Sequence, residues 1–289
     1  MFKGILIGDA YGAGFEFKNS MLIHNDAKKY YNHPTHMASD GSGNSLLAGP
    51  YTDDTQMSIA VAESLLSEDF SKESFAKSFV DTFHRDKRKG YASGFYSFLM
   101  NHTTADGFIK DIKPFSVKNG AAMRSVPLGV LSDPDQVMKV AETQASLTHD
   151  TKFGIDSSKI VALAAYYMLR KDSKEGLIPF IEHKVPGYNL TETWTASVPC
   201  HGISTVKAAL TVLMCTDSMK EALIKSVAFG GDTDSVASIT LGILECYKNK
   251  IDDIPKNLID TCEQGNYGLD FCLDLEQRLF KKYNIRTSA

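Results

Sequence analysis

No stretch of the sequence is apolar over the roughly 18 to 20 residues that a membrane-spanning helix needs. The first residues, MFKGILIGDAYGAGF, also lack the basic start, the apolar middle and the cleavage site of a secretory signal. We therefore expect no membrane segment and a cytoplasmic location.

Paired cysteines and an excess of basic residues are also missing. The five cysteines are odd in number, and no two of them are spaced as C-x-x-C, which supports neither a disulfide framework nor a zinc site. Lys and Arg number 31 against 35 Asp and Glu, so the net charge is −4. Without a positive field to hold a phosphate backbone, general binding to nucleic acid is not expected.

Alternating strands bounded by turns are hard to find, whereas helical spacing is common. Met57, Ala60, Val61 and Leu65 fall on one helical face, and a similar pattern starts at Val236. Further helices are expected over 75–83, 137–148, 160–170, 205–214 and 219–229. This pattern predicts an all-α fold.

Two polar stretches, 39–49 and 102–119, are predicted to be loops rather than linkers, because apolar helical segments resume on both sides of each. No repeat of fixed period or low-complexity tract divides the chain. We therefore expect residues 1–289 to form a single compact domain of many helices.

Gly4, Gly8 and Gly12 recur every four residues, which would align them along one face of a helix. A face without side chains lets another backbone come close. The same segment has neither the lysine of a phosphate loop nor the G-x-G-x-x-G spacing after a strand. Close packing of two helices is favoured over phosphate binding.

Residues 51–56 read YTDDTQ and lead directly into the helical run from Met57. Thr and Asp are common N-caps, and acids in the first turn interact favourably with the helix dipole. Thr52, Asp53 and Asp54 could therefore be a cap alone. Three consecutive oxygen-bearing side chains exceed what a cap requires, so a ligand-binding role is equally open.

Residues 230–235, GGDTDS, repeat this arrangement before a second apolar helix, and Gly230 and Gly231 would let the backbone turn tightly near a ligand. The two helix starts supply six oxygen-bearing side chains: Thr52, Asp53, Asp54, Asp232, Asp234 and Ser235. Mg²⁺ and Mn²⁺ prefer such a set, whereas zinc prefers His or Cys. Two divalent ions would balance the four carboxylates, provided that the two helix starts meet in space.

Five segments, taken in order, resemble the signature segments of the ADP-ribosylglycohydrolase family: GILIGDAYGAGFEF, YTDDTQ, NGAAMRSVPLGVL, SLTHD and FGGDTDSVASITLGIL. The two acidic motifs together make the resemblance specific. It implies a compact all-α domain with a binuclear Mg²⁺ centre in a central cleft, with Mn²⁺ as the other cation considered. It also implies an enzyme that removes ADP-ribose from modified protein side chains.

The resemblance further implies roles for individual residues. The metal ligands would be Thr52, Asp53, Asp54, Asp232, Asp234 and Ser235, the last in place of a threonine common in the family. The catalytic residues would be Glu16, Asp53 and Asp234, with the general base left open among the acids. The substrate-binding residues would be Asn119, Gly120, Met123, His149, Gly230 and Gly231. Arg124, in the same segment as Met123, could instead brace a neighbouring helix.

The implied reaction hydrolyses the bond between ADP-ribose and a side chain of a modified protein, with ADP-ribose as the product. An acidic pocket would suit the positively charged guanidinium of arginine-linked ADP-ribose, and the resemblance to the compact bacterial members of the family favours that substrate. The open alternatives are a serine-linked substrate, O-acetyl-ADP-ribose, a modified nucleic-acid base, and a non-catalytic protein that only binds ADP-ribose.

Overall fold

The computed structural model describes residues 1–17, 27–29 and 49–285. Within these ranges the regular elements are helices, and extended backbone pairs only at three isolated bridges. The α-helices in chain order are α1 (Phe2–Gly12), α2 (Asp53–Ser67), α3 (Lys72–Arg85), α4 (Ser93–Asn101), α5 (Ala105–Asp111), α6 (Gly120–Met123), α7 (Pro134–Ala145), α8 (Lys152–Met168), α9 (Leu177–Lys184), α10 (Gly202–Cys215), α11 (Met219–Ala228), α12 (Thr233–Glu245), α13 (Lys256–Thr261) and α14 (Leu269–Lys282). The predicted all-α fold is confirmed.

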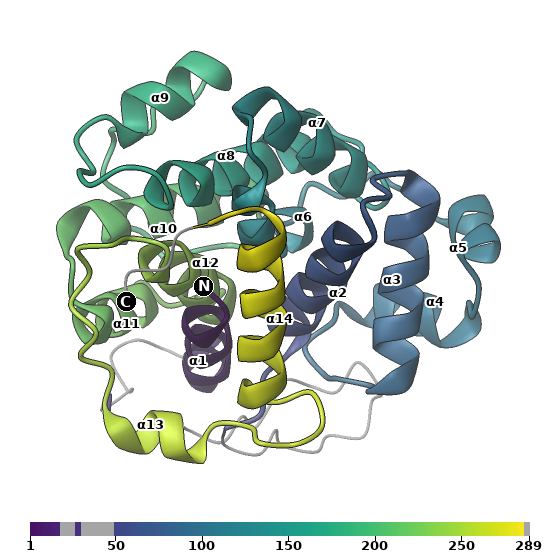
Figure 1. Cartoon of the computed structure of the whole chain (residues 1–289), viewed down its shortest axis with the longest axis horizontal. Coiled ribbons are helices and arrows are strands. Elements are labelled where there is room, and N and C mark those ends of the chain that lie inside the picture. Colours follow the sequence, from purple (N-terminus) through teal and green to yellow (C-terminus); the bar gives the residue numbers. More distant parts are fainter. Residues whose placement is uncertain (18–26, 30–48, 286–289) are drawn as a thin grey trace.

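Helices α1 and α12 run side by side near the centre of the molecule, with α14 beside α1 (Figure 1). A Cβ atom added to Gly4 would lie 2.3 Å from the carbonyl oxygen of Leu241, and one on Gly8 would lie 2.4 Å from that of Ala237. At Gly12 it would lie 2.6 Å from the Cα of Asp234. The predicted close helix packing is confirmed, and it brings the end of α1 to the start of α12.

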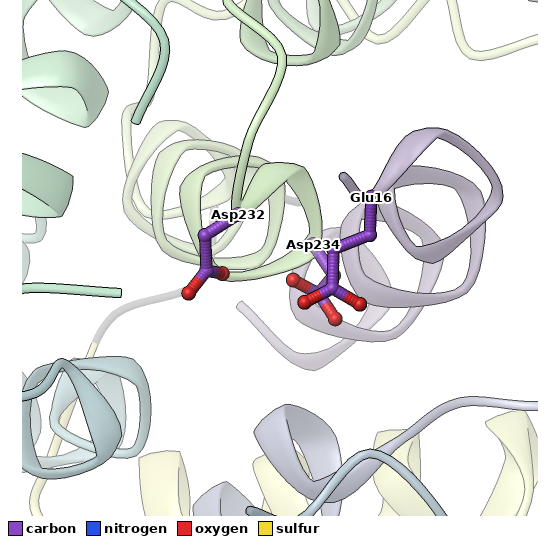
Figure 2. Close-up of side chains that lie close together, drawn as sticks. All are labelled: Glu16, Asp232 and Asp234. Carbon is purple, nitrogen blue, oxygen red and sulfur yellow. The ribbon is translucent and has the colours of Figure 1, made fainter. Parts of the chain in front are cut away.

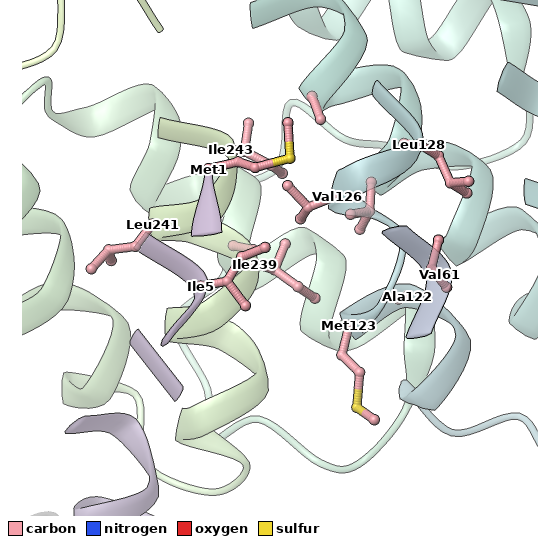
Figure 3. Close-up of a cluster of buried hydrophobic side chains, with 14 of the residues drawn as sticks. Met1, Ile5, Val61, Ala122, Met123, Val126, Leu128, Ile239, Leu241 and Ile243 are labelled. Atoms are coloured by element: carbon pink, nitrogen blue, oxygen red, sulfur yellow. The ribbon is translucent and has the colours of Figure 1, made fainter. Parts of the chain in front are cut away.

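The hydrophobic core joins segments from the whole length of the described chain. Figure 3 shows a part of it, to which Ile5 of α1, Ile239 of α12, Val61 of α2 and Val126 of the 3₁₀ helix η3 (Val126–Val130) all contribute. All four side chains are buried. Because α1, α2 and α12 share this core, the starts of α2 and α12 are held on a rigid support.

The segment 102–119 is not a continuous loop, as the sequence suggested, because α5 lies within it. The Thr104 side chain caps α5 by accepting a hydrogen bond from the Gly107 N–H at 3.2 Å, and Phe108 is fully buried. The short polar helix has only one buried apolar residue, so its sequence carries little helical periodicity. Of the other predicted loop, 39–49, all but Gly49 lies outside the described residues.

None of the helices in the described ranges is both long and apolar enough to cross a membrane.

Helix α14 was not anticipated from the sequence, although it buries Leu269, Cys272, Leu275 and Leu279 along one side. It packs against α1 and α2 and covers the core on the side that faces the viewer in Figure 1.

Candidate active site

A cavity of about 750 Å³ opens where α2 and α12 begin. Its volume lies within the range of pockets that enclose small organic ligands. Six acidic side chains line it: Asp111 at the rim, and Glu16, Asp53, Asp54, Asp232 and Asp234 from the ends of α1, α2 and α12. The two acidic motifs, far apart in the sequence, therefore meet in space, as the metal-site hypothesis requires.

Glu16, Asp232 and Asp234 form the tightest part of this acidic group. Each offers a carboxylate oxygen, and these oxygens lie within 4.8 Å of one another. Figure 2 shows the three carboxylates directed to the same side, Glu16 next to Asp234. Glu16 follows the 3₁₀ helix η1 (Ala13–Phe15), which continues α1, so the packing of α1 on α12 places it there.

The start of α2 contacts the start of α12 directly. Asp54 accepts a hydrogen bond from the Ser238 hydroxyl at 2.7 Å and a longer one from the Ser235 hydroxyl at 3.4 Å. Asp54 and Ser235 are buried and line the cavity. Side chains of both motifs thus form one continuous polar wall.

The helix starts at the site differ from others in the molecule. Ser71, Asp133 and Ser218 cap their helices by accepting a hydrogen bond from a first-turn N–H. Thr52 and Asp232 occupy the same position before α2 and α12, yet neither side chain makes a capping hydrogen bond. Capping therefore does not account for the oxygen atoms gathered here.

Thr52 is instead bound to Asp9 of α1. Its hydroxyl donates to Asp9 Oδ1 at 2.7 Å, and its backbone N–H donates to the same carboxylate at 3.1 Å and 3.0 Å. Thr55 also donates to Asp9, from its hydroxyl at 2.6 Å and its N–H at 2.9 Å. Asp9 was not singled out in the sequence, because an acid within an apolar helix reveals its partners only in three dimensions.

Gly90 covers the other side of the α2 start. Its φ of +103° suits glycine, and a Cβ there would lie 2.3 Å from Asp53 Oδ1 and 2.7 Å from the Thr52 Cβ. The backbone at Gly90 thus packs directly on two predicted ligands. Sequence analysis missed this residue, since a glycine among lysines in a connecting segment looks like an ordinary turn.

Crowding of the carboxylates changes their proton affinities. Burial, followed by the charge of Asp232, raises the pKa of Glu16 well above its ordinary value. Burial and Asp9 raise the pKa values of Asp53 and Asp54, and burial and Glu16 raise that of Asp234. A bound cation would favour the ionised forms and so release protons.

The donor set fits a hard divalent cation. The gathered atoms are carboxylate and hydroxyl oxygens, which Mg²⁺ and Mn²⁺ prefer, and the carboxylates gain most from a neutralising charge because they are largely buried. Thr52 itself is fully buried and is not among the residues that line the cavity. Its neighbours Asp53 and Asp54 face the cavity.

Asn119, Gly120, Met123 and His149 line a second wall of the cavity. The Asn119 side-chain amide donates to Asp232 Oδ2 at 2.9 Å and to the Thr205 hydroxyl at 3.1 Å. It therefore orients the Asp232 carboxylate.

His149 is buried with its Nδ1 atom 2.7 Å from the Thr148 hydroxyl. Burial, together with the positive charges of Arg124 and Lys118, lowers its pKa to about 3. The ring is therefore neutral at physiological pH. It can exchange hydrogen bonds with a ligand without adding positive charge to the site.

Gly230 and Gly231 are not among the residues that line the cavity. Both have positive φ, and Gly230 accepts a hydrogen bond from the Val198 N–H at 3.1 Å. A Cβ on Gly231 would lie 2.1 Å from the Val198 carbonyl oxygen, which in turn accepts from the Asp232 N–H at 2.9 Å. Their observed effect is to turn the chain so that Asp232 enters the cavity.

Arg124 braces the neighbouring α7, one of the two possibilities open from the sequence. Its guanidinium donates to the Gln144 carbonyl oxygen at 3.0 Å and to the Thr148 hydroxyl at 2.9 Å, and it lies over the ring of Phe79. It is almost fully buried and also contributes to the cavity wall.

Aromatic side chains that were not predicted from the sequence as site residues complete the cavity wall. Tyr91, Phe95 and Phe98 line the wall that follows Gly90, and the Tyr91 hydroxyl donates to Gln56 Oε1 at 2.7 Å. Acids at one end and aromatic rings along a wall suit a ligand with both a polar and a flat apolar part.

Comparison with known proteins identifies this architecture. The all-helical fold is that of a known enzyme class, and a model of the ADP-ribosylglycohydrolase family matches residues 1–287. The chain belongs to the ADP-ribosylglycohydrolase family. It is therefore an enzyme, a hydrolase that acts on ADP-ribosyl bonds.

Individual relatives are distant but cover nearly the whole chain. ADP-ribosylhydrolase ARH3 of Bos taurus is 24% identical, over 96% of this chain and 92% of its own length. ADP-ribosyl-[dinitrogen reductase] glycohydrolase of Rhodospirillum rubrum is 26% identical, over 91% and 88%. A solved structure titled ADP-ribosylglycohydrolase-related protein complex matches 99% of this chain and 96% of its own, with a TM-score of 0.74 at 20% identity, which shows the shared fold.

Proposed function

We propose that the protein is a divalent-cation-dependent hydrolase that releases ADP-ribose from ADP-ribosylated proteins, with arginine-linked ADP-ribose as its preferred substrate. The observation that carries the proposal is the meeting of Glu16 with the acidic starts of α2 and α12 at one cavity. The relatives support it, because their names describe hydrolysis of ADP-ribosyl bonds.

Mg²⁺, or Mn²⁺ in its place, would be held by Thr52, Asp53, Asp54, Asp232, Asp234 and Ser235. Two ions would balance most of the negative charge that these residues and Glu16 bring together. When bound, such ions supply positive charge that orients hydroxyl groups and lowers the pKa of water.

The protein's own side chains would perform the remaining steps. Asn119, Gly120, Met123 and His149 form the wall against which the substrate lies, and His149 presents a neutral ring to it. Glu16 is assigned as the group that takes a proton from the attacking water, because its carboxylate lines the cavity within 4.8 Å of those of Asp232 and Asp234. The remaining carboxylates stabilise positive charge that develops on the ribose ring.

The acidic site favours a positively charged leaving group. Arginine-linked ADP-ribose carries one: when the C–N bond breaks, its electron pair stays on the nitrogen, so the group leaves as neutral guanidine, while the positive charge passes to the ribose carbon beside the carboxylates. A serine-linked substrate is the second candidate, since its leaving oxygen needs a proton and the raised pKa of Glu16 would allow Glu16 to supply one.

The test compares arginine-, serine- and base-linked ADP-ribose, each with Mg²⁺ and with a chelator, by measuring released ADP-ribose. We expect fastest release from arginine and loss of release on chelation. The double variant Asp53→Asn, Asp232→Asn should lose activity, while Asp274→Asn, an exposed change on α14, should retain it. Binding of ADP-ribose without release from any substrate would contradict the proposal, and release that survives both chelation and the double variant would contradict its metal dependence.

A further inference from the structure

We propose that Asp9 is a positioning residue for the divalent cation and that it acts through Thr52. It lies on α1, fully buried, and is not among the residues that line the cavity. The inference rests on the proposed metal site. It concerns how the protein prepares a ligand rather than which residues are ligands.

The Asp9 carboxylate gathers the donors of the first turn of α2. One oxygen accepts from the Thr52 hydroxyl at 2.7 Å, and the other accepts from the Thr55 hydroxyl at 2.6 Å. The backbone N–H groups of the same two threonines complete the arrangement, at 2.9 to 3.1 Å. A buried carboxylate with this many donors is a strong acceptor that keeps its partners in place.

This arrangement decides the direction of the Thr52 hydroxyl. A hydroxyl has one proton to donate and two lone pairs to offer. With its proton directed to Asp9, Thr52 can offer only lone pairs elsewhere, which is the state that a cation ligand needs. Asp53 Oδ1 and the Thr52 hydroxyl oxygen lie 2.3 Å and 3.1 Å from the same point, the Cβ position at residue 90, so without Asp9 the Thr52 proton could turn toward another predicted ligand.

Gly90, on the opposite side of Thr52, limits the other orientations that the Thr52 side chain could adopt. The position of a Cβ at residue 90 would be 2.7 Å from the Thr52 Cβ and 3.1 Å from its hydroxyl oxygen. Thr52 is therefore packed between the backbone at Gly90 and the carboxylate of Asp9. Its side chain has little room to find another orientation.

The competing explanation is that Asp9 only fastens α2 to α1. Thr55 separates the two explanations, because it donates to the same carboxylate but is not a predicted ligand. Replacing Thr55 with the similarly shaped Val removes one hydrogen bond from this network and leaves the Thr52 hydroxyl bound to Asp9. If Asp9 only fastened α2 to α1, replacing Asp9 and replacing Thr55 would have the same effect on cation binding.

The experiment measures the dissociation constant of Mn²⁺ for the full chain by the electron paramagnetic resonance signal of free Mn²⁺. Asp9→Ala, Asp9→Asn and Thr55→Val are compared with the unaltered protein in 1 M sucrose, which favours the compact state. Thermal melts identify the folded samples. Asn retains one acceptor oxygen, so it serves as the conservative replacement.

We expect Asp9→Ala to raise the Mn²⁺ dissociation constant by about tenfold or more, as changes in residues that orient metal ligands do. Asp9→Asn should fall between Asp9→Ala and the unaltered protein, and Thr55→Val should stay within about twofold of the latter although it melts earlier. If Asp9→Ala does not fold, Asp9→Asn decides. A folded Asp9 variant with unchanged Mn²⁺ affinity, or an equal loss in Thr55→Val, would overturn the inference.

Failure of this inference can be told apart from failure of the proposed function. Unchanged Mn²⁺ affinity in the Asp9 variants, with ADP-ribose release intact in the unaltered protein, removes the role of Asp9 alone. Mn²⁺ binding by the unaltered protein without release of ADP-ribose from any substrate removes the proposed function and leaves the role of Asp9 standing.

Discussion

At the scale of single residues, the site contains buried acidic side chains, and their burial lowers the stability of the fold. Glu16, Asp54 and Asp234 are buried in close proximity, and desolvation opposes their ionisation. Residues that serve ligand binding or catalysis often reduce stability in this way. Stability and activity should therefore respond in opposite directions when one acid is neutralised.

Glu16→Gln tests this opposition. The amide keeps the shape of the side chain but removes a group whose ionised form is disfavoured, so the melting temperature measured with a chelator should rise. Release of ADP-ribose at saturating Mg²⁺ should fall by about 10²- to 10⁴-fold, the usual contribution of a general acid or base. Unimpaired release would exclude Glu16 as the proton-transfer group, and Asp274→Asn serves as the control for both measurements.

The buried His149 leads to a prediction about how the stability of the protein depends on pH. Its pKa is lowered to about 3 in the folded protein against an ordinary value of 6.5, so the unfolded chain takes up the proton first as the pH falls. Its contribution to stability is therefore fully present above pH 6.5 and is lost progressively toward pH 3, by about 1.4 kcal/mol per pH unit. Between pH 6.5 and 5 the loss should be about 2 kcal/mol.

The measurement is urea unfolding of the unaltered protein and of His149→Gln across this pH range. The difference in unfolding free energy between the two proteins should shift in favour of the variant as the pH falls. His183→Gln, which replaces an exposed histidine, should show a smaller change. A difference that is independent of pH would mean that His149 does not resist protonation in the folded state.

At the scale of helices, the spacing of Gly4, Gly8 and Gly12 was the most informative pattern in the sequence. It predicted a close helix contact, and the structure adds that the partner is α12. The partner helix could not be inferred from the sequence, because the α12 segment has no matching row of glycines that would mark it. The same limit applies to Asp9 and Gly90, whose importance depends on neighbours that are distant in the chain.

Gly8→Ala should destabilise the protein despite the better helix propensity of Ala. The added Cβ would lie 2.4 Å from the Ala237 carbonyl oxygen, so α1 and α12 must separate, and overpacking of this kind costs about 1 to 3 kcal/mol. We expect the melting temperature to fall by several degrees.

Gly94→Ala is the matched control, since nothing lies within 4 Å of a Cβ added there on α4. Its melting temperature should stay the same or rise slightly, because Ala is the better helix former. Equal effects of the two substitutions would show that the contact between α1 and α12 is looser than the structure indicates.

At the scale of the whole molecule, the sequence predicted the all-α class and most of the long helices, because their apolar faces repeat regularly. It did not predict α4, α5, α6, α9, α13 or α14. The two acidic motifs pointed to a metal site, but their meeting had to be assumed until the arrangement of α1, α2 and α12 was known. Roles of the individual site residues remain predictions.

Cation binding should stabilise the entire fold, since the site joins three regions of the chain. A ligand at about 100 times its dissociation constant adds about 2.7 kcal/mol when it binds only the folded state. The melting temperature should therefore rise with added Mg²⁺ or Mn²⁺ and should stay constant for Asp53→Asn, Asp232→Asn. An equal rise in that double variant would place the stabilising ion elsewhere.

The pairing of α1 with α12 also has a consequence for synthesis on the ribosome. Some 230 residues separate Gly12 from Glu245, so at about 5 to 20 residues per second α1 waits roughly 10 to 50 seconds for its partner. During that interval the apolar residues of α1 have no α12 to cover them. The nascent chain should therefore depend on chaperones early, and the proposed cation site should form only after most of the chain has been made.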